Sequence, residues 1–180
     1  MLKKEYNNLI KIKKLRLKNK IRFVKPISFS EKEGLITEFI EGKNLKDYLK
    51  EKIFFEFGKE LKRLHKKNIT HGQLEAQDVI YKNGLFYLVD IPCLNKKKAL
   101  EDYSRFKISI HLHQIKNFLK WNKYNKCSDA FTRGYGPDQS LEKEYLKKEL
   151  YQIVSYYKKR RFVDKIKGFF IDFVLRKRFV

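Results

Sequence analysis

A predicted β-hairpin around Asn83 and Gly84 constrains the fold of this chain more than any other local feature. The β-rich segments VIYKN and LFYLVD surround the turn, and an Asn-Gly pair favours tight hairpin turns. Upstream, residues 53–65 carry four apolar side chains on one helical face: Phe54, Phe57, Leu61 and Leu64. A polar loop over 68–77 lies between them. The sequence therefore predicts a core-facing helix, a loop and a hairpin in direct succession.

Two further elements are predicted before the central helix. Residues 3–17 have the apolar spacing of an amphipathic helix. Residues 21–30 and 35–40 are rich in β-formers and flank a Glu-Lys-Glu-Gly turn, which is typical of a second hairpin. Asn44 is then expected to cap a short helix over 45–49.

Composition limits the class of protein but not its partner. The 180 residues suit one compact domain, and a 42% hydrophobic share with 15 Phe and 11 Tyr is ample for a core. Lysine and arginine outnumber acids 43 to 21, a net charge of +22, which favours nucleic acid, anionic lipid headgroups or phosphorylated ligands. The same enrichment in Lys, Glu, Ile, Phe and Tyr also suits a thermophile or an A+T-rich genome.

The sequence carries no predicted export signal or membrane span. Its start, MLKKEYNNLIKIKKLRL, lacks the apolar core of a signal peptide, and no stretch approaches the roughly 18 apolar residues of a spanning helix. Cys93 and Cys127 form neither a disulfide framework nor a C-x-x-C metal spacing. We expect a cytoplasmic protein, soluble or peripheral at the inner membrane surface.

Residues 64–90, LHKKNITHGQLEAQDVIYKNGLFYLVD, resemble the catalytic and metal-binding segments of protein-kinase-like phosphotransferases. The direct matches are His71, Gly72 and Leu74. Gln73 stands at the place of the catalytic Asp, Asp78 at that of the Asn, and Asp90 at that of the metal-binding Asp. The resemblance implies that His71 has a structural, buttressing role rather than a catalytic one.

The H-G form of this loop resembles the lipopolysaccharide kinase, aminoglycoside phosphotransferase and small archaeal-type kinase branches. The stretches EDYSRFKISI and FTRGYG also look like those branches. Upstream, the helix with Glu5, the strand with Pro26 and the segment ITEFIEGKNLKDYL look like the C-helix, two strands and the interlobe hinge. By this resemblance Glu41, in the hinge segment, would contact the nucleotide. The resemblance covers residues 3–135.

The resemblance implies ATP and Mg²⁺ as cofactors, with Asp78 and Asp90 as metal ligands, because hard cations prefer oxygen ligands. Two departures argue against turnover. The carboxamide of Gln73 cannot accept a proton as a general base does. No G-x-G-x-x-G occurs in the chain, and no strand with a phosphate-binding lysine is expected before the first helix. Glu5 is therefore predicted to be a surface glutamate.

Several of these residues have simpler readings that the sequence leaves open. Asp78 either binds metal or caps the turn before Val79, and Asp90 is either a metal ligand or an ordinary loop carboxylate. Asp102, near a helix start, either braces the 68–77 loop or caps its own helix. Proline after Asp90, in the pair Ile91-Pro92, favours a rigid loop at that point.

From residue 99 onward the chain is predicted to be helical, with a turn at 134–137. The last stretch, residues 158–180, alternates basic clusters with Phe, Val, Ile and Leu. Its apolar side could dock on the domain, its aromatic side could lie on an anionic membrane, or its charge and aromatics could contact nucleic acid.

We therefore predict an α+β fold that resembles the mostly helical C-terminal lobe of a kinase. Residues 1–41 would form a remnant N-terminal lobe of one helix and a hairpin, 42–157 the C-terminal lobe, and 158–180 a basic amphipathic tail. The predicted function is a pseudokinase-type binding or regulatory module with another protein or an anionic surface as partner. The alternatives are an ATP-dependent phosphotransferase acting on a sugar or lipid-linked sugar, with Glu75 or Asp78 as base, and a basic binder of nucleic acid or anionic membrane.

Overall fold

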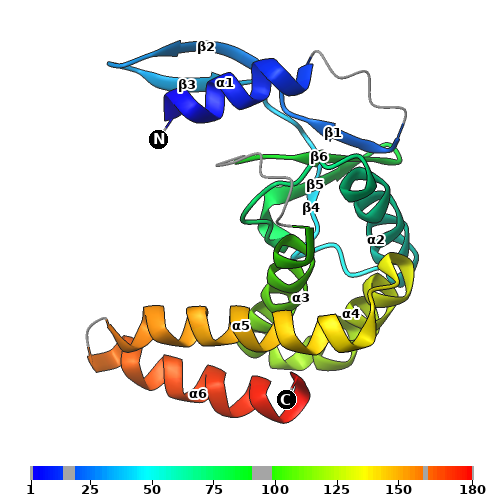
Figure 1. Ribbon diagram of the computed structural model, residues 1–180, viewed down its shortest axis with the longest axis vertical. Coiled ribbons are helices and arrows are strands. Elements are labelled where there is room, and N and C mark those ends of the chain that lie inside the picture. The colour runs from blue at the N-terminus through cyan, green and yellow to red at the C-terminus, as the bar shows by residue number, and fades with distance from the viewer. Residues whose placement is uncertain (1, 14–18, 91–98, 160–161, 180) are drawn as a thin grey trace.

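The structure is a computed structural model that describes residues 2–13, 19–90, 99–159 and 162–179 (Figure 1). The segment Ile91-Pro92, for which a rigid loop was predicted, and Cys93 lie outside the described residues. So do residues 14–17 of the first predicted helix.

Helices make up most of the described chain. The α-helices are α1 (Leu2–Lys13), α2 (Glu51–Lys66), α3 (Ala99–Lys116), α4 (Trp121–Tyr135), α5 (Gln139–Lys158) and α6 (Phe162–Phe179). Two short 3₁₀ helices are η1 (Ala76–Asp78) and η2 (Phe118–Lys120). The prediction of an α+β fold with a mostly helical main part is confirmed.

In the described part of the chain, two small sheets accompany the helices. The larger has the order β1 (Ile21–Phe23), β6 (Leu85–Leu88), β5 (Val79–Lys82) and β4 (Lys43–Asn44), with β1 parallel to β6 and the other pairs antiparallel. The smaller pairs β2 (Pro26–Ser30) with β3 (Gly34–Thr37). At the predicted Asn-Gly turn, φ is +49° at Asn83 and +79° at Gly84, which is the left-handed backbone that a tight hairpin requires.

Two upstream predictions need correction. The first strand of the predicted 21–40 hairpin is divided: β1 joins β6 in the larger sheet, and only β2 pairs with β3. The helix predicted over 45–49 is a turn. Asn44 is part of β4, and its side chain accepts the Lys46 N–H and donates to the Gln77 carbonyl at 2.5 Å, so it closes a turn instead of starting a helix.

The main core lies between α2, α3, α4 and the larger sheet. The four predicted apolar residues of α2 are all fully buried: Phe54, Phe57, Leu61 and Leu64. The rings of Phe57 and Phe106 lie 4.8 Å apart, and those of Phe106 and Phe131 lie 4.6 Å apart. An aromatic cluster from three helices therefore supports the loop that follows α2.

A second apolar cluster joins α5 and α6 to one turn of α3. Its buried members are Ile108, Leu146, Leu150, Val154, Ile171, Leu175 and Phe179. Figure 1 shows α5 and α6 side by side along one end of the molecule, with α1, β2 and β3 at the other end. The last helix thus docks on the domain. None of the described helices is apolar enough over a sufficient length to cross a bilayer.

The smaller sheet packs against α1. The rings of Tyr6 and Phe29 stack with centroids 5.7 Å apart, and Leu9 and Ile12 of α1 are buried. Glu5 is only 8% exposed, so the prediction of a surface glutamate is wrong. The helix turns this residue inward together with its apolar face, because positions 5, 9 and 12 share one side of an α-helix.

Candidate functional site

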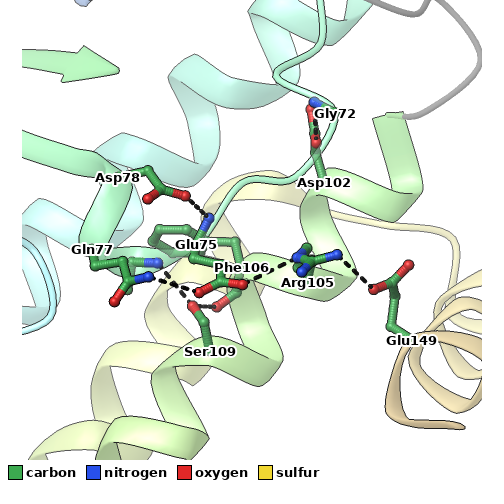
Figure 2. Close-up of polar contacts among 10 residues, drawn as sticks. Gly72, Glu75, Gln77, Asp78, Asp102, Arg105, Phe106, Ser109 and Glu149 are labelled. Atoms are coloured by element: carbon green, nitrogen blue, oxygen red, sulfur yellow. Dashed lines mark hydrogen bonds and ion pairs between the residues drawn. The ribbon is translucent and has the colours of Figure 1, made fainter. Parts of the chain in front are cut away.

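The loop over residues 68–78, between α2 and β5, is held by one buried carboxylate. The backbone N–H groups of His71 and Gly72 donate to the two oxygens of Asp102, at 2.6 and 2.7 Å. Asp102 lies in the first turn of α3 and is fully buried; Figure 2 shows it beneath Gly72. Of the two roles considered for Asp102, the structure shows the bracing of the loop.

His71 connects this loop to the end of β6. Its ring Nε2 lies 2.8 Å from the Val89 carbonyl, and burial lowers the pKa of His71. A second histidine, His65 of α2, places its Nε2 3.5 Å from Asp102 and its Nδ1 2.9 Å from the Tyr135 hydroxyl. The helix, the loop and the hairpin therefore meet at one buried polar cluster.

Asp78 closes the last turn of the loop. Its carboxylate accepts the Glu75 N–H at 2.8 Å, and the Glu75 side chain accepts the Asp78 N–H, so the two residues cap η1 reciprocally. Burial raises the pKa of Asp78 to about 7, and the carboxylates of Glu75 and Asp90 add to the increase. Asp78 thus caps a turn, and its carboxyl group interacts electrostatically with the carboxylate of Asp90.

Asp90 ends the hairpin in an unusual backbone conformation. Its φ is +61°, a left-handed value that non-glycine residues seldom adopt and that is enriched at functional positions. The residue is exposed, yet its charge acts on both Asp78 and His71. The structure therefore brings the two predicted metal ligands into one electrostatic neighbourhood.

The other two predicted site residues are at the surface. Gln73 is exposed and directly follows the braced His71-Gly72 pair. Glu41 is exposed in the segment between β3 and β4. Within the described ranges, no group of three or more His, Cys, Asp or Glu side chains is arranged to hold a metal ion, so a cation here would rest on Asp78 and Asp90 with further ligands from solvent or substrate.

Sequence reasoning missed the residues that support the loop from below. Arg105 Nε donates to Glu75 at 3.2 Å, and its Nη1 lies 3.9 Å from Glu149 of α5. The Ser109 hydroxyl accepts the Ala76 N–H at 2.8 Å (Figure 2). Arg105 and Ser109 follow Asp102 by three and seven positions, so helical spacing from Asp102 was the signal that could have identified them.

No protein-family model matches the chain, but three curated proteins are similar to it. The "Probable serine/threonine-protein kinase BUD32 homolog" of Archaeoglobus fulgidus is 23% identical over 117 residues, which cover 63% of this chain and 58% of the relative. The "KEOPS complex subunit Bud32" of Pyrococcus abyssi is 26% identical over 108 residues, covering 56% of this chain and 45% of the relative.

The third relative is the "Probable bifunctional tRNA threonylcarbamoyladenosine biosynthesis protein" of Methanobrevibacter smithii, 22% identical over 117 residues. The match covers 63% of this chain but 22% of that protein. The chain thus spans less than two thirds of each relative. Together with the braced loop and the hairpin that follows it, these similarities support the protein-kinase-like superfamily as the class of this chain.

Proposed function

We propose that this chain is a degenerate protein-kinase-like module that binds a partner without transferring phosphate. The observation that carries the proposal is the contrast between an intact loop scaffold and a changed reactive position. His71 and Gly72 are braced by Asp102, whereas Gln73 occupies the place of the catalytic Asp. A carboxamide cannot take a proton from a hydroxyl, and loss of a general base slows a reaction by about 10²–10⁴-fold.

Weak divalent-metal binding is part of the proposal. Asp78 and Asp90 would hold Mg²⁺, whose charge would offset the burial, and the repulsion by neighbouring carboxylates, that raise the pKa of Asp78. ATP would reach the metal from the side of the β3–β4 segment, where Glu41 would contact the nucleotide. The ion would supply charge neutralisation for the phosphates.

The proposed partner is another protein. The Pyrococcus relative is by name a subunit of the KEOPS complex, which supports a role within a protein assembly for this chain. We further propose a cytoplasmic location and a division into residues 1–41, 42–157 and 158–180. We also propose that the chain is more similar to the lipopolysaccharide kinase, aminoglycoside phosphotransferase and small archaeal-type kinase branches than to typical eukaryotic protein kinases.

Thermal unfolding with and without ATP and Mg²⁺ or Mn²⁺ tests this function, because a ligand that binds the native state raises Tm. We expect Mn²⁺ to raise Tm and Asp90→Ala to remove that increase, while Glu144→Ala, which removes an exposed carboxylate of α5, keeps it. The unaltered chain should consume ATP no faster than the Asp90→Ala variant does. Phosphate transfer by the unaltered chain above that level would overturn the proposal.

One observation favours an active phosphotransferase as the second candidate. A base works best when its pKa lies near the working pH, and burial brings the pKa of Asp78 to about 7. In that case Asp78 would deprotonate a hydroxyl of a sugar or lipid-linked sugar. Turnover that is lost in Asp78→Asn but retained in Gln73→Ala would select this candidate.

A third candidate, binding to an anionic membrane surface, is favoured by the outer side of α6. Phe169, Phe170 and Phe173 are 61%, 54% and 62% exposed in a chain of net charge +22. Aromatic side chains and basic residues are the two components of interfacial binding. Sedimentation with phosphatidylglycerol vesicles that weakens steeply with salt, and that is lost in Phe173→Ser but not in Phe39→Ser, would support it. Nucleic acid would compete for the same charge, and its binding would also fall with salt.

A further inference from the structure

A groove of about 900 Å³ opens beside the 68–78 loop, between α3 and the α5–α6 pair. The loop contributes Glu75 and Gln77 to its rim. The apolar side chains that line it come from all three helices: Leu112, Ile115, Ile153, Tyr157, Phe170 and Ile171. Its volume lies within the roughly 300–1,000 Å³ of small-molecule sites.

The apolar wall of the groove ends at a cation. Lys116 lies four positions after Leu112, so the two share one side of α3, and both line the groove. Arg105 on the same helix is occupied by Glu75 at 3.2 Å. Lys116 is exposed and has no ion-pair partner within the described part of the chain. A ligand that lies along the wall would therefore meet an available positive charge.

The groove also opens toward the aromatic outer side of α6. Phe170 lines the groove and is still 54% exposed. His113, next to Lys116 in the lining, has its pKa lowered by burial, so at neutral pH it offers hydrogen bonds without adding charge. The lining thus combines a long apolar surface, an exposed entrance and a cation, Lys116, that pairs with no acidic group among the described residues.

We infer that this groove binds a single-chain amphiphile with an anionic head group. The alkyl chain of this ligand lies against Leu112, Ile153 and Ile171, and its head group pairs with Lys116. Neither Asp78 nor Asp90 lines this groove, so the proposal does not require that the loop bind metal or transfer phosphate.

Calorimetric titration of the full chain with dodecyl phosphate, below its critical micelle concentration, tests the site. Each additional buried CH₂ contributes about 0.8 kcal/mol, or roughly fourfold in affinity, so decyl phosphate should bind at least several-fold more weakly. Ile153→Trp fills the groove and should lower the affinity for dodecyl phosphate at least tenfold. Tyr151→Trp, at a 69% exposed position of the same helix that does not line the groove, should bind as the unaltered chain does.

The head group is tested by a matched pair of charge variants. Lys116→Gln should weaken the binding of dodecyl phosphate several-fold but leave the binding of the uncharged dodecyl maltoside unchanged. Lys147→Gln removes the same charge from an exposed position of α5 that does not line the groove and should have no effect. Equal weakening by the two variants would overturn the proposal, since only net charge would then matter.

Three other outcomes would also overturn the proposal. If glycerol phosphate binds as tightly as dodecyl phosphate, the protein recognises the phosphate but has no site for the alkyl chain. Unchanged binding in Ile153→Trp would place the chain elsewhere, such as on the exposed phenylalanines of α6. If Ile153→Trp does not fold, Gln152→Trp narrows the groove from an exposed position, and unchanged binding in that variant would overturn the proposal equally.

Discussion

At the scale of single residues, Asp102 explains how a polar loop can pass through the interior of this protein. Buried backbone N–H groups need partners, and each one left unpaired costs about 1–3 kcal/mol. Asp102 satisfies two of them, at His71 and Gly72, with one carboxylate. The same bonds hold the backbone immediately before Gln73, so the exposed Gln73 side chain extends from a braced backbone.

Asp78 should make the fold less stable as pH rises. Its folded pKa of about 7 exceeds the roughly 3.9 of an unfolded Asp, so between these values the native state binds more protons than the unfolded state. The destabilisation is absent below pH 4 and complete above pH 7. Asp78→Asn keeps an oxygen for the Glu75 N–H but does not ionise. We expect the Tm of this variant to equal that of the unaltered chain at pH 4 and to be about 2–4 °C higher at pH 8. That increase corresponds to a gain in the free energy of unfolding on the order of 1 kcal/mol.

Thermal melts across this range, in buffer with a chelator, measure the effect. Glu144→Gln, which removes the charge of an exposed carboxylate on α5, should leave the pH dependence as it is. A difference between Asp78→Asn and the unaltered chain that stays constant from pH 4 to 8 would contradict the assignment to Asp78 ionisation.

At the scale of elements, α2 and α4 approach each other through two glycines. A Cβ on Gly58 would lie 2.8 Å from the Tyr135 nitrogen of α4, and one on Gly134 would lie 2.9 Å from the Phe55 carbonyl carbon of α2. Both neighbours are backbone atoms, which cannot move aside as a flexible side chain can. This close contact brings the Tyr135 hydroxyl within hydrogen-bond distance of His65, so that Tyr135 joins the polar cluster behind the loop.

Gly58→Ala should therefore destabilise the protein even though alanine is the better helix former by about 1 kcal/mol. Overpacking in a dense core costs about 1–3 kcal/mol, and a rigid backbone neighbour puts this site at the upper end. Urea unfolding measures the loss. Asn122→Ala, at an exposed position of α4, should leave stability equal or raise it slightly. A stabilised Gly58→Ala would show that the two helices can separate without loss.

At the scale of the whole molecule, α3 joins two apolar clusters. Its Phe106 belongs to the core with α2 and α4, whereas Ile108 belongs to the cluster of α5 and α6. Polar contacts also cross from α3 to α5: Tyr103 donates to Glu142 at 2.5 Å, and Lys107 does so at 2.6 Å. The α5–α6 pair is therefore a satellite: it has an apolar cluster of its own and is joined to the main core through α3.

Leu175→Ala should loosen the satellite first. Leu175 is 1% exposed, and a buried Leu→Ala change costs about 2–5 kcal/mol. Amide hydrogen exchange should accelerate in α5 and α6 while the amides of α2 stay protected, since local opening follows cooperative units. Phe173→Ala, two positions away and 62% exposed, should change the exchange rates neither in α5 and α6 nor in α2. Equal acceleration in α2 would mean that the molecule opens as a single unit.

Much of this fold could be predicted because the relevant signals are local. The apolar stripe of α2 and the Asn83-Gly84 turn depend on helical spacing and turn chemistry, and both are present as expected. The order of the loop residues placed Asp78 and Asp90 as candidates for one site. The placement of β1 beside β6, the burial of Glu5 and the turn after Asn44 were missed, because each depends on contacts with distant segments.

The helix, loop and hairpin succession can be read from residue type and spacing alone, and so can the presence of Gln73 where the kinase-like pattern has Asp. The bracing of the loop by Asp102 and the burial that raises the pKa of Asp78 became visible only in the folded arrangement. The folded arrangement also showed that α3, α5 and α6 enclose a groove ending at Lys116. Burial, hydrogen-bond partners and cavities arise between segments that lie far apart in the chain, and no local pattern of residues records them.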